Sequence, residues 1–220
     1  MFSKAILGVS ATAMLIATGA SAQTMATAAT DLNLRAGPGP NYAINNVIDA
    51  EADVTVLGCL EQSNWCEVDY NGEQGWAYGD YLATQLEGEY VAVYPNMEAT
   101  ETKVVTYDET AHEEGALALG SMGAAVGALA IGGPAAIVGG AIIGAATGVT
   151  LSPEEKTVTY IQQNPVEPVF VNGEVVKGAT VPVEVTAYQV PDAEYEYINL
   201  NGRYVLVQPD SREIVYIADF

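Results

Sequence analysis

Apolar and polar residues alternate in short runs between residues 31 and 86, and this period predicts strands. Two clear runs lie at 54–57 and 67–70, and glycine, proline and asparagine separate the runs from one another. Because the predicted strands are short and evenly spaced over about sixty residues, we expect a small barrel or sandwich in this part of the chain.

A second series of short runs predicts an antiparallel sheet over residues 154–220. We expect strands at 157–162, 169–171, 174–176, 183–188, 195–200, 203–207 and 213–217. Two Asn-Gly pairs, at 172–173 and 201–202, have the composition of two-residue hairpin turns, because both central positions of such turns need positive φ. The predicted fold class is therefore mainly β.

The segment 115–150 lies between these two β-rich parts and carries no charge. Its bulky residues recur at steps of three and four, which predicts a helix, and Gly-Gly-Pro at 132–134 would interrupt it. After the break, small residues recur at every fourth position, and they include Gly140, Gly144 and Gly148. Because this spacing lets two helix backbones approach closely, we expect a Gly-rich α-helical hairpin with a glycine seam.

The role of this hairpin has three interpretations. Each arm of about 15 residues would be roughly 23 Å long, shorter than the roughly 30 Å hydrocarbon layer of a membrane. Since each interior glycine costs a helix about 1 kcal/mol, the hairpin needs lipid or a partner surface. One interpretation is a glycine zipper that inserts into a membrane or forms homo-oligomers there. The others are a hydrophobic tether folded against a β-module and a poorly ordered Gly/Ala linker.

The segment 87–114 is predicted to be an acidic linker with two marginal strands, at 90–94 and 103–107. It contains His112, the single histidine of the chain. One imidazole without a nucleophile or a second histidine indicates neither a catalytic triad nor a metal site. The three carboxylates at 49–53 lack the glycine and the later glutamate of a calcium loop, so we expect no metal site there.

The first residues have the features of a secretory signal peptide. Lys4 precedes an apolar run at 5–17, and Ala20-Ser21-Ala22 fits the cleavage site, so we expect residues 1–22 to be removed and Gln23 to begin the mature chain. Export across the inner membrane predicts a protein of the periplasm or cell envelope, membrane-associated if the zipper inserts. The mature chain keeps six basic and 28 acidic residues, a net charge of −22, which disfavours binding to nucleic acid.

Cys59 and Cys66 are the only two cysteines of the chain, and an exported protein permits them to form a disulfide. A turn at 62–63 between the predicted strands would place the two residues opposite each other. A redox or metal role is the weaker interpretation, because C-x₆-C is not the spacing of a redox pair and no second ligand pair exists.

Several short motifs follow one another between residues 32 and 82. They are LNLRAGP at 32–38, VTVLG at 54–58, Trp65, Val68, Gly75-Trp76 and Tyr81-Leu82. Together they resemble the bacterial SH3 domain, which the resemblance places at residues 23–86. It implies an SH3-like barrel of five to six strands. Such modules are often attached to envelope proteins, and some bind peptidoglycan or its peptides.

The aromatic residues of this module have two interpretations. Tyr42, Trp65, Trp76, Tyr78 and Tyr81 could line a ligand groove; alternatively, Trp65 and Trp76 are core or hairpin residues of a very small barrel, and both interpretations stay open. The single cation of the module is Arg35. We expect it to brace the opening loop against a neighbouring carboxylate rather than to contact a ligand.

The C-terminal third carries motifs of its own, namely PVEPV at 165–169, YQVPD at 188–192, Tyr195, Asn201-Gly202 and the stretch from 205 to 216. They resemble domain of unknown function 1236, found in bacterial envelope proteins, and the resemblance implies an architecture and a location but no activity. For Tyr188, Tyr195, Tyr197, Tyr204 and Tyr216 we expect cross-strand packing, with an exposed binding face as the alternative.

These observations favour a non-enzymatic binding or structural protein of the cell envelope. The SH3-like module would contact peptidoglycan peptides or envelope proteins, without a cofactor. The alternative is a membrane-associated oligomer built on the glycine-zipper hairpin. An enzyme is disfavoured, because no general base, activated nucleophile or metal cluster can be assembled from the motifs.

Overall fold

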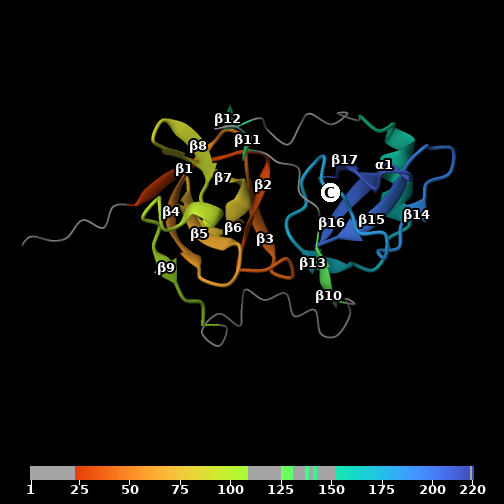
Figure 1. Ribbon diagram of the computed structural model, residues 1–220. Helices are drawn as coiled ribbons and strands as arrows, with labels where there is room; N and C mark the ends of the chain where they lie inside the picture. The colour runs from red at the N-terminus through yellow and green to blue at the C-terminus, as the bar shows by residue number, and fades with distance from the viewer. Residues whose placement is uncertain (1–22, 109–124, 131–136, 139–140, 143–151, 219) are drawn as a thin grey trace, which may run out of the picture.

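The computed structural model describes residues 23–108, 125–130, 137–138, 141–142, 152–218 and 220. Two β-modules lie side by side, one built from the N-terminal half of the chain and the other from the C-terminal third (Figure 1). The prediction of a mainly β fold is confirmed. The predicted signal peptide at 1–22 and His112 lie outside the described residues.

The N-terminal module is one mixed sheet. Its strands are β1 (Thr24–Ala28), β2 (Leu32–Arg35), β3 (Ile44–Ile48), β4 (Asp53–Leu60), β5 (Trp65–Tyr70), β6 (Glu73–Tyr78), β7 (Leu82–Leu86), β8 (Glu89–Ala92) and β9 (Val104–Val105). The strand order is β3-β2-β6-β5-β4-β1-β7-β8, and β9 pairs with β4. Because β7 pairs onward with β8, the described strands form an open path, and the sheet predicted to be an SH3-like barrel is not closed.

The segment predicted to be a linker contributes two of these strands. Both marginal strands exist: β8 pairs antiparallel with β7, and β9 pairs parallel with β4. Between them, a short 3₁₀ helix, η2 (Tyr94–Asn96), turns the chain back across the sheet. Residues 89–105 therefore extend the N-terminal sheet.

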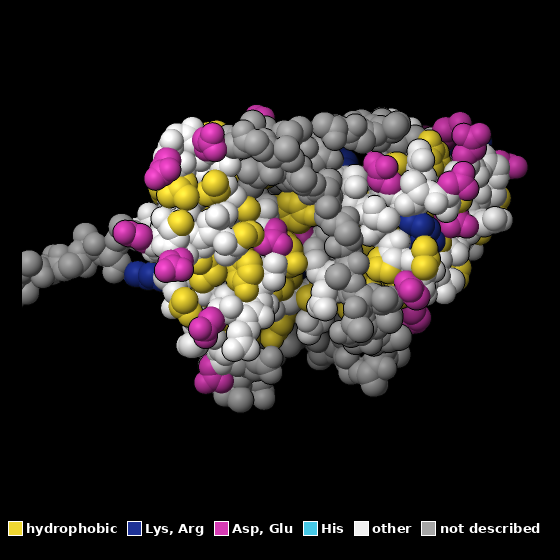
Figure 2. Space-filling model, in the orientation of Figure 1, with side chains coloured by type: hydrophobic (Ala, Val, Ile, Leu, Met, Phe, Trp, Pro, Cys, Tyr) yellow, Lys and Arg dark blue, Asp and Glu magenta, His cyan; other side chains and the backbone are white. Residues whose placement is uncertain are grey.

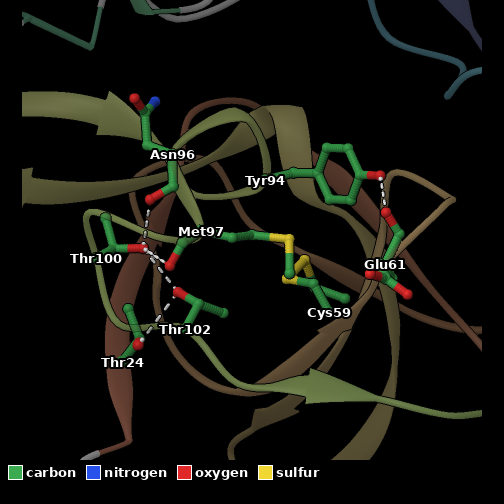
Figure 3. The surroundings of a disulfide bond; sticks show 9 residues. Thr24, Cys59, Glu61, Tyr94, Asn96, Met97, Thr100 and Thr102 are labelled. Carbon is green, nitrogen blue, oxygen red and sulfur yellow. Dashed lines mark hydrogen bonds between the residues drawn. A yellow bond between two sulfur atoms is a disulfide. The ribbon is translucent and has the colours of Figure 1, made fainter.

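The predicted disulfide is confirmed. Cys59 in β4 lies directly opposite Cys66 in β5, and the two sulfur atoms are bonded. Both cysteines are fully buried. The side chain of Met97, just after η2, reaches toward the disulfide, and the hydroxyl of Tyr94 donates to the carbonyl of Glu61 at 3.3 Å (Figure 3). The disulfide thus lies beneath the segment around Tyr94 and Met97, which follows β8.

The C-terminal module is a four-stranded antiparallel sheet covered by one α-helix. Its strands are β14 (Tyr188–Gln189), β15 (Glu196–Leu200), β16 (Arg203–Val207) and β17 (Ile214–Ile217), in sequence order across the sheet. The hairpin predicted at Asn201-Gly202 is confirmed: both residues have positive φ, and they join β15 to β16.

The strand predicted at 157–162 is wrong, because these residues lie in the helix α1 (Glu155–Gln163). The β-branched residues of TVTYI favour a strand by propensity. However, Thr157 and Ile161 are four residues apart and both are buried, as on one face of a helix. Ile161 packs in a cluster with Tyr197, Leu206 and other sheet residues, and this tertiary packing outweighs the local preference.

Two other predicted strands are wrong or shortened. The run at 174–176 has no strand, and of 183–188 only Tyr188 begins one, β14. The Asn-Gly pair at 172–173 makes no hairpin, because β13 (Phe170–Asn172) has no antiparallel partner after the turn. Residues 174–185 instead form a loop. Its valines at 175, 176, 181 and 185 are buried in the core, whereas Val183 is exposed, so most of the apolar pattern reflects burial in a loop rather than a strand.

The Gly-rich helical hairpin predicted at 115–150 is not confirmed. Its described pieces are the strands β10 (Ala125–Ala130), β11 (Ile137–Val138) and β12 (Ala141–Ile142). β10 pairs parallel with β13, and β11 pairs with β12. Interior glycines weaken a helix, whereas a neighbouring strand supplies partners for the backbone. The seam residues Gly140, Gly144 and Gly148 lie outside the described residues.

One buried hydrophobic cluster runs through both modules. It includes Leu32, Leu34 and Val54 from the N-terminal sheet, and Val175 and Ile198 from the C-terminal module. In the part of the chain that the structure describes, no helix is long and apolar enough to span a bilayer. The buried cluster thus joins the two sheets in one hydrophobic core.

Replacing both Cys59 and Cys66 with alanine should lower the free energy of unfolding by about 2.5 kcal/mol, because the cross-link closes a loop of about eight residues in the unfolded chain. Urea titrations of the oxidised protein and the double variant measure the difference. Adding a reductant should lower the stability of the wild type and leave the variant unchanged. Equal urea midpoints for both proteins would contradict the prediction.

Candidate binding site

Strand β2 alternates two core leucines with two polar side chains. Leu32 and Leu34 point into the shared core, so alternation along the strand directs Asn33 and Arg35 to the opposite face. Asn33 and Arg35 are nevertheless buried, with Arg35 only 1% exposed. The C-terminal module covers this face of the N-terminal sheet.

Arg35 forms a buried ion pair with Glu174, a residue of the C-terminal module. The Nε of Arg35 donates to Oε2 at 3.2 Å, and Nη2 donates to Oε1 at 3.1 Å, so the pairing is bidentate. The same Oε1 accepts from Nδ2 of Asn33 and from the backbone N–H of Val175, both at 2.8 Å. The carboxylate is thus held by four donors from two modules.

The other donors of Arg35 hold two loops. Nη1 donates to the carbonyls of Pro40 and Tyr42 at 3.1 and 3.0 Å, and Nη2 donates to the carbonyl of Asn201 at 3.3 Å. All five N–H groups of the guanidinium are therefore used. Arg35 braces the opening loop, as expected, but its carboxylate partner comes from 139 residues along the chain.

The loop that carries Glu174 is fixed by a second buried side chain. The amide of Asn201 accepts from the N–H of Val171 at 2.8 Å and donates to the carbonyls of Val171 and Gly173 at 3.0 and 3.1 Å. Asn201 is fully buried. The hairpin turn between β15 and β16 therefore sets the position of Glu174.

The five predicted groove residues fall into two groups. Trp65, Tyr78 and Tyr81 lie near the ion pair: the guanidinium carbon of Arg35 lies 6.0 Å from the ring centroid of Trp65, and the Trp65 and Tyr78 rings meet edge to face at 5.5 Å. The rings of Tyr78 and Tyr81 are 6.1 Å apart. Trp65 and Tyr81 are buried, so this group faces the interior of the docked molecule.

Tyr42 and Trp76 form the second group, and they are joined by Tyr107. Its ring lies 5.8 Å from the ring of Tyr42 and 5.4 Å from that of Trp76, both edge to face. Both partners are buried. Tyr107 belongs to the predicted strand at 103–107, but nothing in that run indicated where its ring would lie.

Burial also raises the pKa of several side chains in this region. It raises the pKa of Tyr78 to about 12, and the charges of Asp80 and Glu174 add to the shift. The pKa of Tyr81 is raised further, again mainly by burial. Burial raises the pKa of Asp80 as well, against a hydrogen bond from Asn64 at 2.8 Å that lowers it.

A cavity of about 350 Å³ lies beside Asn33, between the two modules. Asp31 and Asp49 line it from the N-terminal module, and Lys177 and Arg203 from the C-terminal module. Arg203 also donates to Oδ1 of Asn33 at a long 3.5 Å. The lining of the cavity thus contains both acidic and basic side chains at the junction of the two modules.

Comparison with family models agrees with this division of the chain. Residues 30–83 match the bacterial SH3 domain. Residues 160–219 match a domain of unknown function, DUF1236. No curated protein and no solved structure matches the chain. The N-terminal sheet is hereafter called the SH3 module. Its similarity to the bacterial SH3 domain suggests a binding module.

Two of the tyrosines predicted in the C-terminal sheet pack against each other across strands. Tyr188 lies opposite Tyr197, with ring centroids 5.7 Å apart, and Tyr197 meets Tyr160 of α1 edge to face. Tyr197 is buried and donates to the carbonyl of Asn164 at 2.9 Å. Among the described residues, no group of three potential metal ligands lies together. The ligand role of the SH3 aromatics stays a prediction.

Replacing Glu174 with glutamine should destabilise the protein by about 3 to 5 kcal/mol, because it leaves the charge of Arg35 buried without its counter-ion. The double variant Arg35→Met with Glu174→Leu should recover most of this loss. Urea unfolding measures all three. As a control, Lys156→Met removes an exposed ion pair with Glu154 and should not move the urea midpoint. A Glu174 variant as stable as wild type would contradict the buried pair.

Stability should fall between pH 10 and pH 12 because of Tyr78. Its pKa is raised from 10.0 to about 12 in the fold, so ionisation favours the unfolded chain above pH 10. Below pH 10 the phenol is neutral in both states and its contribution is fully present. Melting temperatures measured from pH 9 to pH 12 should decline less steeply for Tyr78→Phe than for wild type. If the melting temperatures of wild type and Tyr78→Phe declined equally with pH, the loss of stability could not be assigned to Tyr78.

Proposed function

We propose that this protein is a non-enzymatic binding protein of the bacterial cell envelope. Its SH3 module would hold an extended peptide, from the cell wall, on the face that carries Tyr42 and Trp76. The family match supports a binding role for residues 30–83. The observation that supports the proposal is the ring of Tyr107, which comes from the segment after β9 and packs edge to face against Tyr42 and Trp76.

The docked C-terminal module has a supporting role in this proposal. Glu174 and the carbonyl of Asn201 accept hydrogen bonds from Arg35. Arg35 in turn donates to the carbonyls of Pro40 and Tyr42 and so holds their loop. Because Tyr42 is part of the aromatic face, the C-terminal module fixes one side of the face. A preorganised surface loses less entropy when it binds.

The surface charge limits which ligands suit the protein. Figure 2 shows acidic side chains scattered over both modules on the visible face, with few basic ones. With a net charge of −21 for the whole chain, a strongly anionic polymer would be repelled. Peptides with neutral or basic side chains are the better match. The alternative of a zipper-based membrane oligomer gains no support from residues 125–130, which are extended.

Retention on purified peptidoglycan tests the proposal. Trp76→Ala should reduce the retained fraction about tenfold or more, because a buried aromatic residue at the centre of a contact carries much of the binding energy. Tyr188→Ala, which removes a partly exposed aromatic residue from the other module, is the matched control and should be retained like wild type. Equal retention of the two variants would remove Trp76 from the site, and no retention of wild type would refute a wall ligand.

A further inference from the structure

We propose that residues 102–107, hereafter the strap, are an internal ligand of the SH3 module. The surface beneath the strap would then bind an extended peptide with an aromatic side chain once the strap leaves. This surface consists of the edge of β4 at Gly58–Leu60, which β9 occupies, and the rings of Tyr42 and Trp76; it is hereafter the strap site. The inference rests on the proposed function and names the partner class and its regulation.

The backbone of the strap adds a strand to an open edge. β1 pairs with β4 only as far as Thr24 opposite Val56, so the edge of β4 beyond that point is free of β1. β9 takes this edge in parallel, with Cys59 opposite Val104, and the N–H of Cys59 donates to the carbonyl of Lys103 at 2.8 Å. Strand addition to an exposed edge is a common mode of peptide binding.

Gly58 makes the close crossing of the strap possible. A Cβ at this position would clash with the side chain of Val105 and lie 2.9 Å from the carbonyl oxygen of Lys103. The register between β4 and β5 shifts between Val56 and Gly58, so the glycine lies at an irregularity of the strand. The strap site therefore has a glycine where a peptide backbone must pass.

The side chains of the strap are held at its two ends. At one end, the buried hydroxyl of Thr102 lies 2.8 Å from that of Thr100 and 3.4 Å from that of Thr24 (Figure 3). At the other end, Tyr107 packs edge to face against Tyr42 and Trp76. The aromatic ring is thus the anchor that a competing peptide would have to supply.

The middle of the strap is weakly held. β9 contains only two residues, and Val104 is 59% exposed. Lys103 and Thr106 are also exposed. A segment with few buried contacts opens at a lower free energy than the core beneath it. The strap can therefore exchange with an external peptide while the module stays folded.

The strap also indicates the chemistry of its competitor. It is extended, rich in β-branched residues, and carries one cation, Lys103, and no carboxylate between 102 and 107. The surrounding protein is strongly acidic. A matching partner is an extended, neutral or basic peptide with an aromatic residue two to three positions after the residues that pair with β4.

The test uses the mature chain and a fluorescent, end-capped peptide of residues 102–107. The variant Val105→Asp with Tyr107→Ala releases the strap by removing its anchor and placing a charge against β4. By fluorescence anisotropy, this opened variant should bind the peptide at least tenfold more tightly than wild type. The same peptide with alanine in place of its tyrosine should bind at least tenfold more weakly.

Two further substitutions check where the peptide lies. Adding Trp76→Ala to the opened variant should abolish binding by removing the ring contact, and adding Gly58→Val should abolish it by blocking the backbone. Binding that survives both would overturn the strap site. A folded opened variant that binds no peptide, or binds it no better than wild type, would also overturn the proposal.

If the opened variant does not fold, hydrogen exchange of the wild-type protein tests instead whether the strap opens on its own. The amide of Cys59 should exchange faster than core amides such as that of Val68, because its acceptor lies in the strap. If the amides of Cys59 and Val68 exchanged equally slowly, the strap would open only when the whole protein unfolds, and the proposal would be wrong. Peptide binding without wall retention would leave the strap site standing and refute the wall ligand instead.

Discussion

The guanidinium of Arg35 joins parts of the chain that are far apart in sequence. It uses all five N–H groups, two on the carboxylate of Glu174 and three on backbone carbonyls from both modules. Taking both charges out of water is costly, and only complete hydrogen bonding offsets the cost. The docked arrangement satisfies both buried charges, and a displaced C-terminal module would lose these hydrogen bonds.

This constraint changes how the SH3 module presents its aromatic residues. Trp65, Tyr78 and Tyr81 serve the junction with the C-terminal module, whereas Tyr42 and Trp76 hold the ring of Tyr107. Two of the chain's own segments thus cover the face on which a ligand was expected. An external peptide on this face would therefore have to compete with one of these internal contacts.

Local pattern predicted what depends on neighbours in sequence. The disulfide followed from two alternating runs and a turn, and the β15–β16 hairpin followed from Asn201-Gly202. α1 was missed because its β-branched residues favour a strand and only tertiary packing of Ile161 decides otherwise. Glu174 and Tyr107 were missed as site residues for the same kind of reason. The partner of Glu174 lies 139 residues away and the two ring partners of Tyr107 lie on two other segments, and one sequence carries no signal for such contacts.

The burial of the Arg35–Glu174 pair has a consequence for the ionic medium. Dissolved ions screen charges that face water and hardly reach a pair whose side chains are 1% and 0% exposed. The carboxylates on the outside repel one another, and salt weakens that repulsion. Concentrated salt should therefore weaken the repulsion among the surface carboxylates and leave the buried Arg35–Glu174 pair almost unchanged.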